Sequence, residues 1–71
     1  MAQMAGLDRQ REAIEVGTAL HRLALRYWAR GRSEDARRIA SQAEAILRAH
    51  SPGSPVLAKV IANMDEFEDR A

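Results

Sequence analysis

The stretch from Leu20 to Leu47 places the strongest constraint on how this chain can fold. Apolar residues recur there at helical spacing on both sides of a single break. The break is Gly31, because glycine readily takes the left-handed conformation that ends helices. Ser33 follows as the predicted N-cap of a second helix, and the acidic residues after it suit the positive end of the helix dipole. The stretch therefore predicts two amphipathic helices joined by a tight turn.

Small residues on the second of these helices predict close packing. Ala36, Ala40 and Ala43 share one helical face and give it a shallow surface. The first helix can approach such a surface closely. We therefore expect a large residue at position 40 to overpack this contact.

The first helix is predicted to run from about Asp8 to Arg30, with residues 1–7 disordered. Gly17 lies inside this span, and glycine costs about 1 kcal/mol relative to alanine in a helix interior. A bend at Gly17 is the alternative to one continuous helix. Helical spacing persists across the glycine, so we favour the continuous helix and expect Gly17 to let another helix come close.

A proline-rich loop and a third helix follow the second helix, which should end near Ala49–His50. Two prolines and a glycine fall within Ser51–Pro55, which is a strong loop signal. Ser54 is the predicted cap of the third helix, with Pro55 in its first turn. The apolar residues expected to form the buried face of this helix are Val56, Leu57, Val60, Ile61, Met64 and Phe67. The predicted fold is all-α, with three antiparallel helices.

The ordered set of these residues resembles a tetratricopeptide repeat. The similarity lies in Leu20, Leu23, Ala24, Tyr27, Gly31, Ala36 and Ala43 at their relative spacings. The long second helix, the run Ser54-Pro55-x-Leu57-Ala58 and Asn63-Met64 are similar to the longer repeats of kinesin light chains. The resemblance implies a single domain over residues 8–71, with one repeat at 14–50 and a capping helix at 55–71.

The resemblance also implies a protein-binding groove on the first and third helices, because the first helix of each repeat lines a concave side in this family. The groove residues expected here are Arg22, Leu25, Arg26, Ala62, Asn63 and Glu66. Asn63 matches one of two asparagines that are usual in kinesin-light-chain-type repeats, whereas His21 and Arg22 replace both in the first copy. Such a groove suits a partner helix with acidic and leucine positions, since arginine pairs carboxylates bidentately.

Composition and motifs point away from catalysis and from cofactors. The chain of 71 residues has no cysteine and a net charge of +1, so it lacks thiolate ligands and a strongly basic character. His21 and His50 have no neighbouring nucleophile motif, and we expect structural roles for them. The acidic residues after Met64 lack the spacing of a calcium loop. We therefore expect no enzyme, cofactor, metal, nucleic-acid or membrane partner, and a cytoplasmic location.

The predicted function is that of a protein–protein interaction module, an adaptor or scaffold. A small helical chaperone of a secretion or assembly system is the first alternative, and a helix-turn-helix DNA binder is the second. Self-association as a homodimer is also expected, because apolar surface near Ile14, Val16 and Trp28 is left uncovered and a small chain gains stability from a partner. Trp28 is either half-buried packing or an interface anchor.

Overall fold

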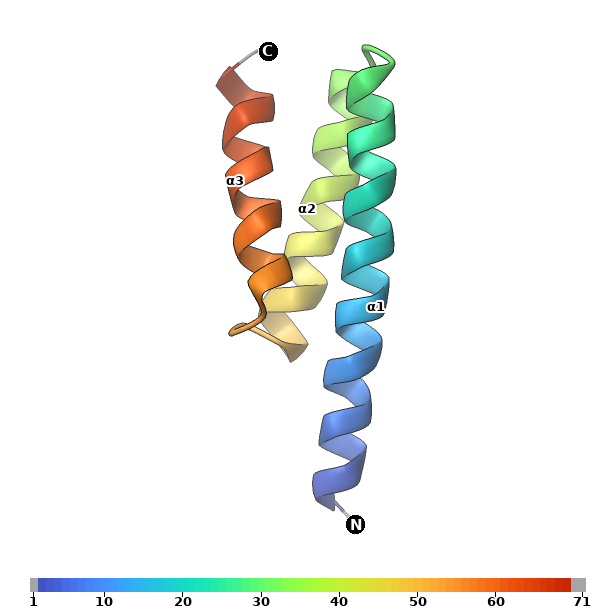
Figure 1. The fold of residues 1–71 in the computed structure, drawn as a ribbon, viewed down its shortest axis with the longest axis vertical. Coiled ribbons are helices and arrows are strands. Elements are labelled where there is room, and N and C mark those ends of the chain that lie inside the picture. Colours follow the sequence, from blue (N-terminus) through green and yellow to red (C-terminus); the bar gives the residue numbers. More distant parts are fainter. Residues whose placement is uncertain (1, 70–71) are drawn as a thin grey trace.

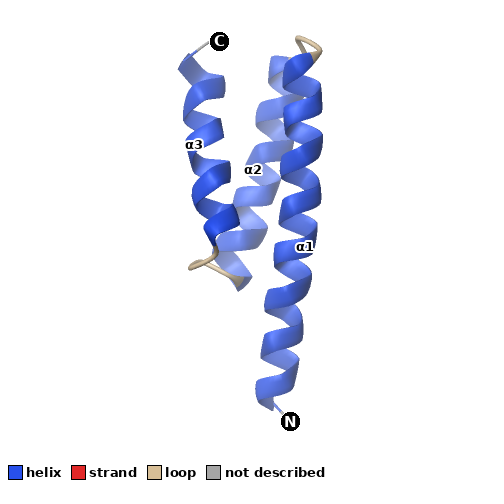
Figure 2. Cartoon of the chain, viewed as in Figure 1, coloured by secondary structure: helices blue, strands red, loops and turns tan. Residues whose placement is uncertain are grey.

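Three antiparallel helices form the structure, which is a computed structural model that describes the backbone of residues 2–69 and the side chains of residues 8–68. Helix α1 spans Ala2–Ala29, α2 spans Ser33–His50 and α3 spans Pro55–Asp69. The chain runs up, down and up again, with two short turns between the helices (Figures 1 and 2). The described residues contain no strand. The prediction of an all-α fold with three antiparallel helices is confirmed.

Helix α1 is longer than the sequence predicted. It begins at Ala2, whereas the sequence predicted a start near Asp8 after a disordered segment at residues 1–7. Most of these residues are good helix formers, and they extend the helix by propensity. Met1 and residues 70–71 lie outside the described part of the chain. The first turns of α1 project beyond the ends of α2 and α3 (Figure 1).

The interface between α1 and α2 is built on small residues. Ala36, Ala40 and Ala43 of α2 are fully buried, as the alanine spacing predicted. Ala24 of α1 is fully buried in the same cluster as two of these alanines. Helices that face each other through methyl groups approach closely, and larger side chains then fill the space toward α3.

Helix α3 packs against α2 and also contacts α1. Phe67, Val60 and Leu47 are the largest fully buried side chains. Phe67 packs with the alanine cluster, while Leu47, Leu57 and Val60 form a second cluster nearer the α2–α3 turn. The predicted apolar face of α3 is therefore the buried one, because its residues at spacings of three and four point toward α2.

The helix ends match the predicted turn chemistry in two places and differ in one. Gly31 has a φ of 80°, the left-handed conformation that ends α1. The Ser54 hydroxyl accepts a hydrogen bond from the Val56 backbone N–H at 3.1 Å, so Ser54 caps α3 as predicted. Ser33, however, is the first helical residue of α2 rather than its cap. Arg32 holds the cap position, and no side-chain capping bond forms there.

Candidate functional site

The polar contact that joins α1 to α3 is a hydrogen bond between His21 and Asn63. Asn63 Nδ2 and His21 Nε2 are the bonded atoms. An amide nitrogen can only donate, so Nε2 accepts and the ring proton of neutral His21 lies on Nδ1. His21 is only 9% exposed. Burial, and then the positive charge of Lys59, lower the pKa of His21 below its ordinary value of 6.5.

A mixed surface surrounds this hydrogen bond, and we name it the α1–α3 face. Its residues are His21 and Leu25 of α1 together with Lys59, Asn63 and Glu66 of α3. Residues three or four positions apart are neighbours on a helix, which places Leu25 beside His21 and puts Lys59 and Glu66 on either side of Asn63. Leu25 is 39% exposed although it is a large apolar residue.

The structure brings together most of the predicted groove residues but not all of them. Leu25, Asn63 and Glu66 belong to the α1–α3 face, and exposed Arg22 stands at its rim, directly after His21. Ala62 is exposed beside Asn63, on the solvent side of α3. These residues place an amide, a cation and apolar surface close together.

The structure places Arg26 apart from the other predicted groove residues. It borders a hollow of about 180 Å³ near the α1–α2 turn. The other residues that line this hollow are Leu23, Tyr27, Arg30 and Arg32. Five positions along a helix correspond to a rotation of about 140°, so Arg26 points away from the side on which His21 meets α3.

Lys59 is the residue of this face that sequence reasoning missed. Its side chain is exposed, and its charge acts on the buried His21 ring. Its position four residues before Asn63 was the available signal, because residues at this spacing share one side of a helix. The side of α3 that faces α1 is set by the contact of Asn63 with His21. Spacing within one helix does not reveal this contact.

Trp28 is mainly an internal packing residue. Its ring stacks on Phe67 of α3, with centroids 4.4 Å apart and planes inclined by 27°. The indole is half-buried at the edge of the alanine cluster. The half-buried packing predicted as one role of Trp28 is therefore confirmed.

A second hollow, of about 340 Å³, lies between the first half of α1 and the end of α2. The residues that line it are Arg9, Glu12, Ala13, Val16, Ile46 and His50. Val16 is 46% exposed here. The expected uncovered apolar surface near Val16 is thus present on this side of α1.

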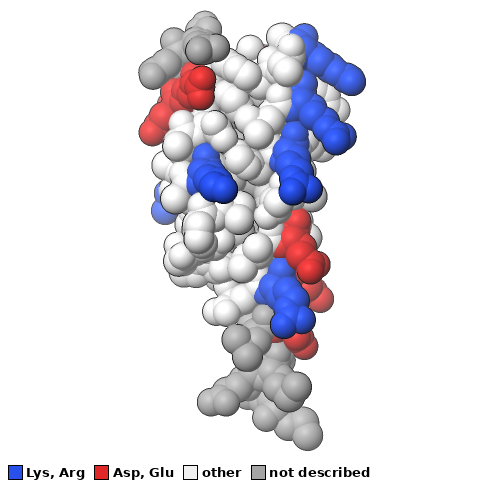
Figure 3. Space-filling model, in the orientation of Figure 1, with Lys and Arg blue, Asp and Glu red and all other residues white. Residues whose placement is uncertain are grey.

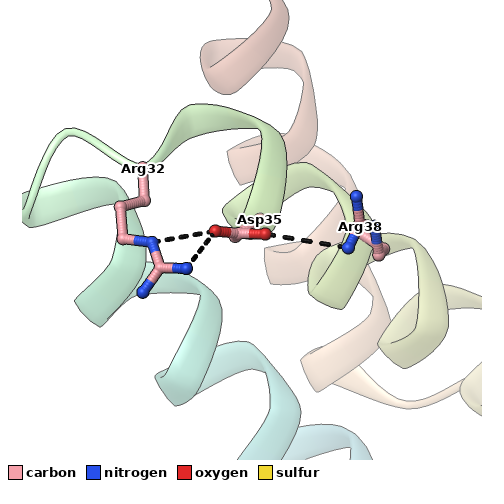
Figure 4. Close-up of polar contacts among 3 residues, drawn as sticks. All are labelled: Arg32, Asp35 and Arg38. Carbon is pink, nitrogen blue, oxygen red and sulfur yellow. Dashed lines mark hydrogen bonds and ion pairs between the residues drawn. The ribbon is translucent and has the colours of Figure 1, made fainter.

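Three ion pairs join described residues of α2 and of the turn before it. Asp35 Oδ2 pairs with Arg32 Nη2 at 2.7 Å, and Asp35 Oδ1 lies 3.7 Å from Arg38 Nη1 (Figure 4). Arg48 pairs with Glu44 one helical turn away. The arginines of α1 take no part in these three ion pairs.

Neither metal-binding clusters nor membrane spans occur in the described part of the chain. No group of three or more histidine, aspartate or glutamate side chains is placed to hold a metal ion among these residues. None of the three helices is both long enough and apolar enough to cross a bilayer. Comparisons with protein-family models, curated proteins and solved structures found no match to this chain.

Proposed function

We propose that this protein is a protein–protein interaction module whose α1–α3 face binds a segment of a partner protein. The observation that carries the proposal is the His21–Asn63 hydrogen bond, which ties the first and third helices together beneath an exposed apolar residue. The resemblance to a tetratricopeptide repeat supports it, since the first helices of successive repeats line the binding side in that family. We include in this proposal that the three helices are arranged as in a tetratricopeptide repeat.

The chemistry of the face indicates the kind of segment it would bind. Leu25 offers apolar contact area, and Arg22 and Lys59 offer positive charge on the two sides of it. A helix or extended segment with a leucine flanked by acidic side chains matches this pattern, because apolar burial and charge pairing then act together.

Site-specific photo-crosslinking tests the proposal. A photoreactive amino acid at Leu25 samples the α1–α3 face, and the same amino acid at exposed Ala45 of α2 is the matched control. We expect crosslinks to a different protein in cell extract from position 25 and not from position 45. Adding Arg22→Glu and Lys59→Glu should abolish these crosslinks while the circular dichroism spectrum stays helical.

Two results would contradict the proposal. One is equal labelling of the same proteins from positions 25 and 45, which would mean that contact is not confined to one face. The other is labelling from position 25 that persists after both charge reversals, since the face would then not select its partner by charge. Crosslinks to a second copy of this chain are a separate outcome, and they bear on the inference below.

A further inference from the structure

The outer face of α1, opposite the core, carries one column of charge that changes sign at its middle. Residues at spacings of three and four share one side of a helix. The residues of this column are Asp8, Glu12, Glu15, Ala19, Arg22, Arg26 and Arg30, the last in the turn after α1. All seven are exposed. Three acids precede Ala19 and three arginines follow it, so the column is acidic at one end and basic at the other.

None of the ion pairs found among residues 8–68 involves a charge of this column. These ion pairs join Arg32, Arg38 and Arg48 to acids of α2. Arg9 and Arg11 stand beside the acidic half, where Arg9 lines the hollow next to α2 and Arg11 lies near Ile14. Figure 3 shows basic groups along the upper half of α1, with acidic groups appearing only along its lower half.

Apolar side chains lie at the point where the charge changes sign. Val16 is 46% exposed and Leu23 is 38% exposed. Val16 is three positions before Ala19 and Leu23 is four positions after it, so the three residues are neighbours on the helix surface. Ala19 has only a methyl group, which lets another helix approach closely at this point. The column therefore has an apolar centre between two charged ends.

We propose that a second copy of this chain binds this column, with the two α1 helices antiparallel about a two-fold axis near Ala19. A two-fold interface uses the same patch on both subunits, so the patch must complement itself. Glu12 and Arg26 are equally distant from Ala19 in opposite directions, and each therefore faces its counterpart in the partner. Asp8 and Arg30 are related in the same way.

The antiparallel arrangement follows from the charges. A parallel pair would bring acids opposite acids and arginines opposite arginines, which is unfavourable. The antiparallel pair joins unlike charges at both ends and buries Val16 and Leu23 at the centre. Contact from Asp8 to Arg30 would extend over about 30 Å at 1.5 Å per residue. This inference is independent of the proposed function, because the α1–α3 face is on another side of α1 and only Arg22 borders both.

Charge reversal at Glu12 and Arg26 tests the arrangement by sedimentation. The unaltered chain should be a dimer, and Glu12→Arg or Arg26→Glu alone should weaken the dimer by about tenfold or more, because symmetry introduces each repulsion twice. An equimolar mixture of the two single variants should form a heterodimer, since every Glu12→Arg site then faces an Arg26→Glu site. Residues 12 and 26 are about 21 Å apart along one helix, so no pairing within a chain explains this rescue.

Glu68→Arg is the control matched to Glu12→Arg, because it makes the same change in net charge at an exposed position on α3. It should leave the dimer unchanged. A fully helical monomer at high micromolar concentration would overturn the inference. A dimer that withstands both single reversals, or a mixture of the two variants that stays monomeric, would overturn it as well.

Discussion

Gly17 of α1 lies directly against the side chain of Leu47 of α2. A methyl group on Gly17 would be only 2.7 Å from Leu47 Cγ and 2.8 Å from Leu47 Cδ1. Leu47 is fully buried, so its side chain has no open space into which it could move. The glycine inside α1 is thus explained by close packing. It continues the small-residue contact that Ala40 and Ala43 begin on the opposite helix.

Gly17→Ala should destabilise the protein although alanine is the better helix former. Helix propensity favours alanine by about 1 kcal/mol. The forced displacement of buried Leu47 costs about 1 to 3 kcal/mol, and we expect this cost to be larger than the gain. Chemical denaturation should therefore show a lower free energy of unfolding for the variant than for the unaltered chain.

The double variant Gly17→Ala with Leu47→Ala separates these two effects. Shortening Leu47 removes the atoms that the new methyl group meets, so Gly17→Ala should be neutral or stabilising in that background. The two changes should then be strongly non-additive, as expected for residues in direct contact. Additive effects would show that Leu47 is not what requires glycine at position 17.

Ala40→Leu should destabilise the protein by about 1 to 3 kcal/mol through overpacking. Ala40 is fully buried between α1 and α2, so added carbon atoms have no space there. Ala45→Leu is the control, because Ala45 lies on the same helix and is exposed. Thermal unfolding should show a lower midpoint for the first variant and little change for the second. Equal midpoints would argue against close packing of α1 on α2.

The two serines before α2 and α3 should respond differently to replacement by alanine. Ser54 accepts the backbone N–H of Val56, and losing such a cap costs about 1 kcal/mol. Ser33 is already inside α2 and makes no capping bond, so Ser33→Ala should be close to neutral. Denaturation curves of the two variants measure the difference directly. An equal loss in both would mean that Ser33 contributes as a cap in solution.

Periodicity predicted the three helices and most of the core because burial and helical spacing are linked. The small residues were the most informative, since Gly17, Ala36 and Ala40 each occupy a position with no room for more atoms. The start of α1 was missed because the first residues of the chain lack the amphipathic spacing of a helix. Ser33 was wrongly predicted to be the N-cap of α2, because the helix begins one residue earlier than expected and Arg32 holds the cap position.

The binding face was harder to predict than the fold. Spacing tells which residues of one helix share a side, and the resemblance to a tetratricopeptide repeat implied that Arg22, Leu25 and Arg26 line a groove. Spacing does not tell how that helix is rotated against its neighbour, which is set by the contact of His21 with Asn63. Arg26 was therefore placed in the groove although it points away from α3. The stacking of Trp28 on Phe67 was missed for the same reason, since it joins two helices far apart in sequence.

Stability should depend on pH through His21. Burial, with Lys59 contributing further, lowers the pKa of this imidazole in the folded protein below 6.5. The unfolded chain then binds the proton more readily than the folded protein does. The stabilisation is therefore complete above pH 6.5 and is lost as the pH falls from there through the lower pKa of the folded state. Protonation also removes the acceptor that Nε2 offers to Asn63.

His21→Gln is the variant that isolates this titration, since glutamine does not ionise and its amide oxygen can accept a hydrogen bond. The measurement is the free energy of unfolding of both proteins from about pH 7.5 down to pH 5. The difference between them should be constant above pH 6.5, and below it the unaltered chain should lose stability relative to the variant. His50 and the carboxylates are present in both proteins, so their contributions cancel in the difference. If the two curves stay parallel over the whole range, His21 is not the group that makes stability depend on pH.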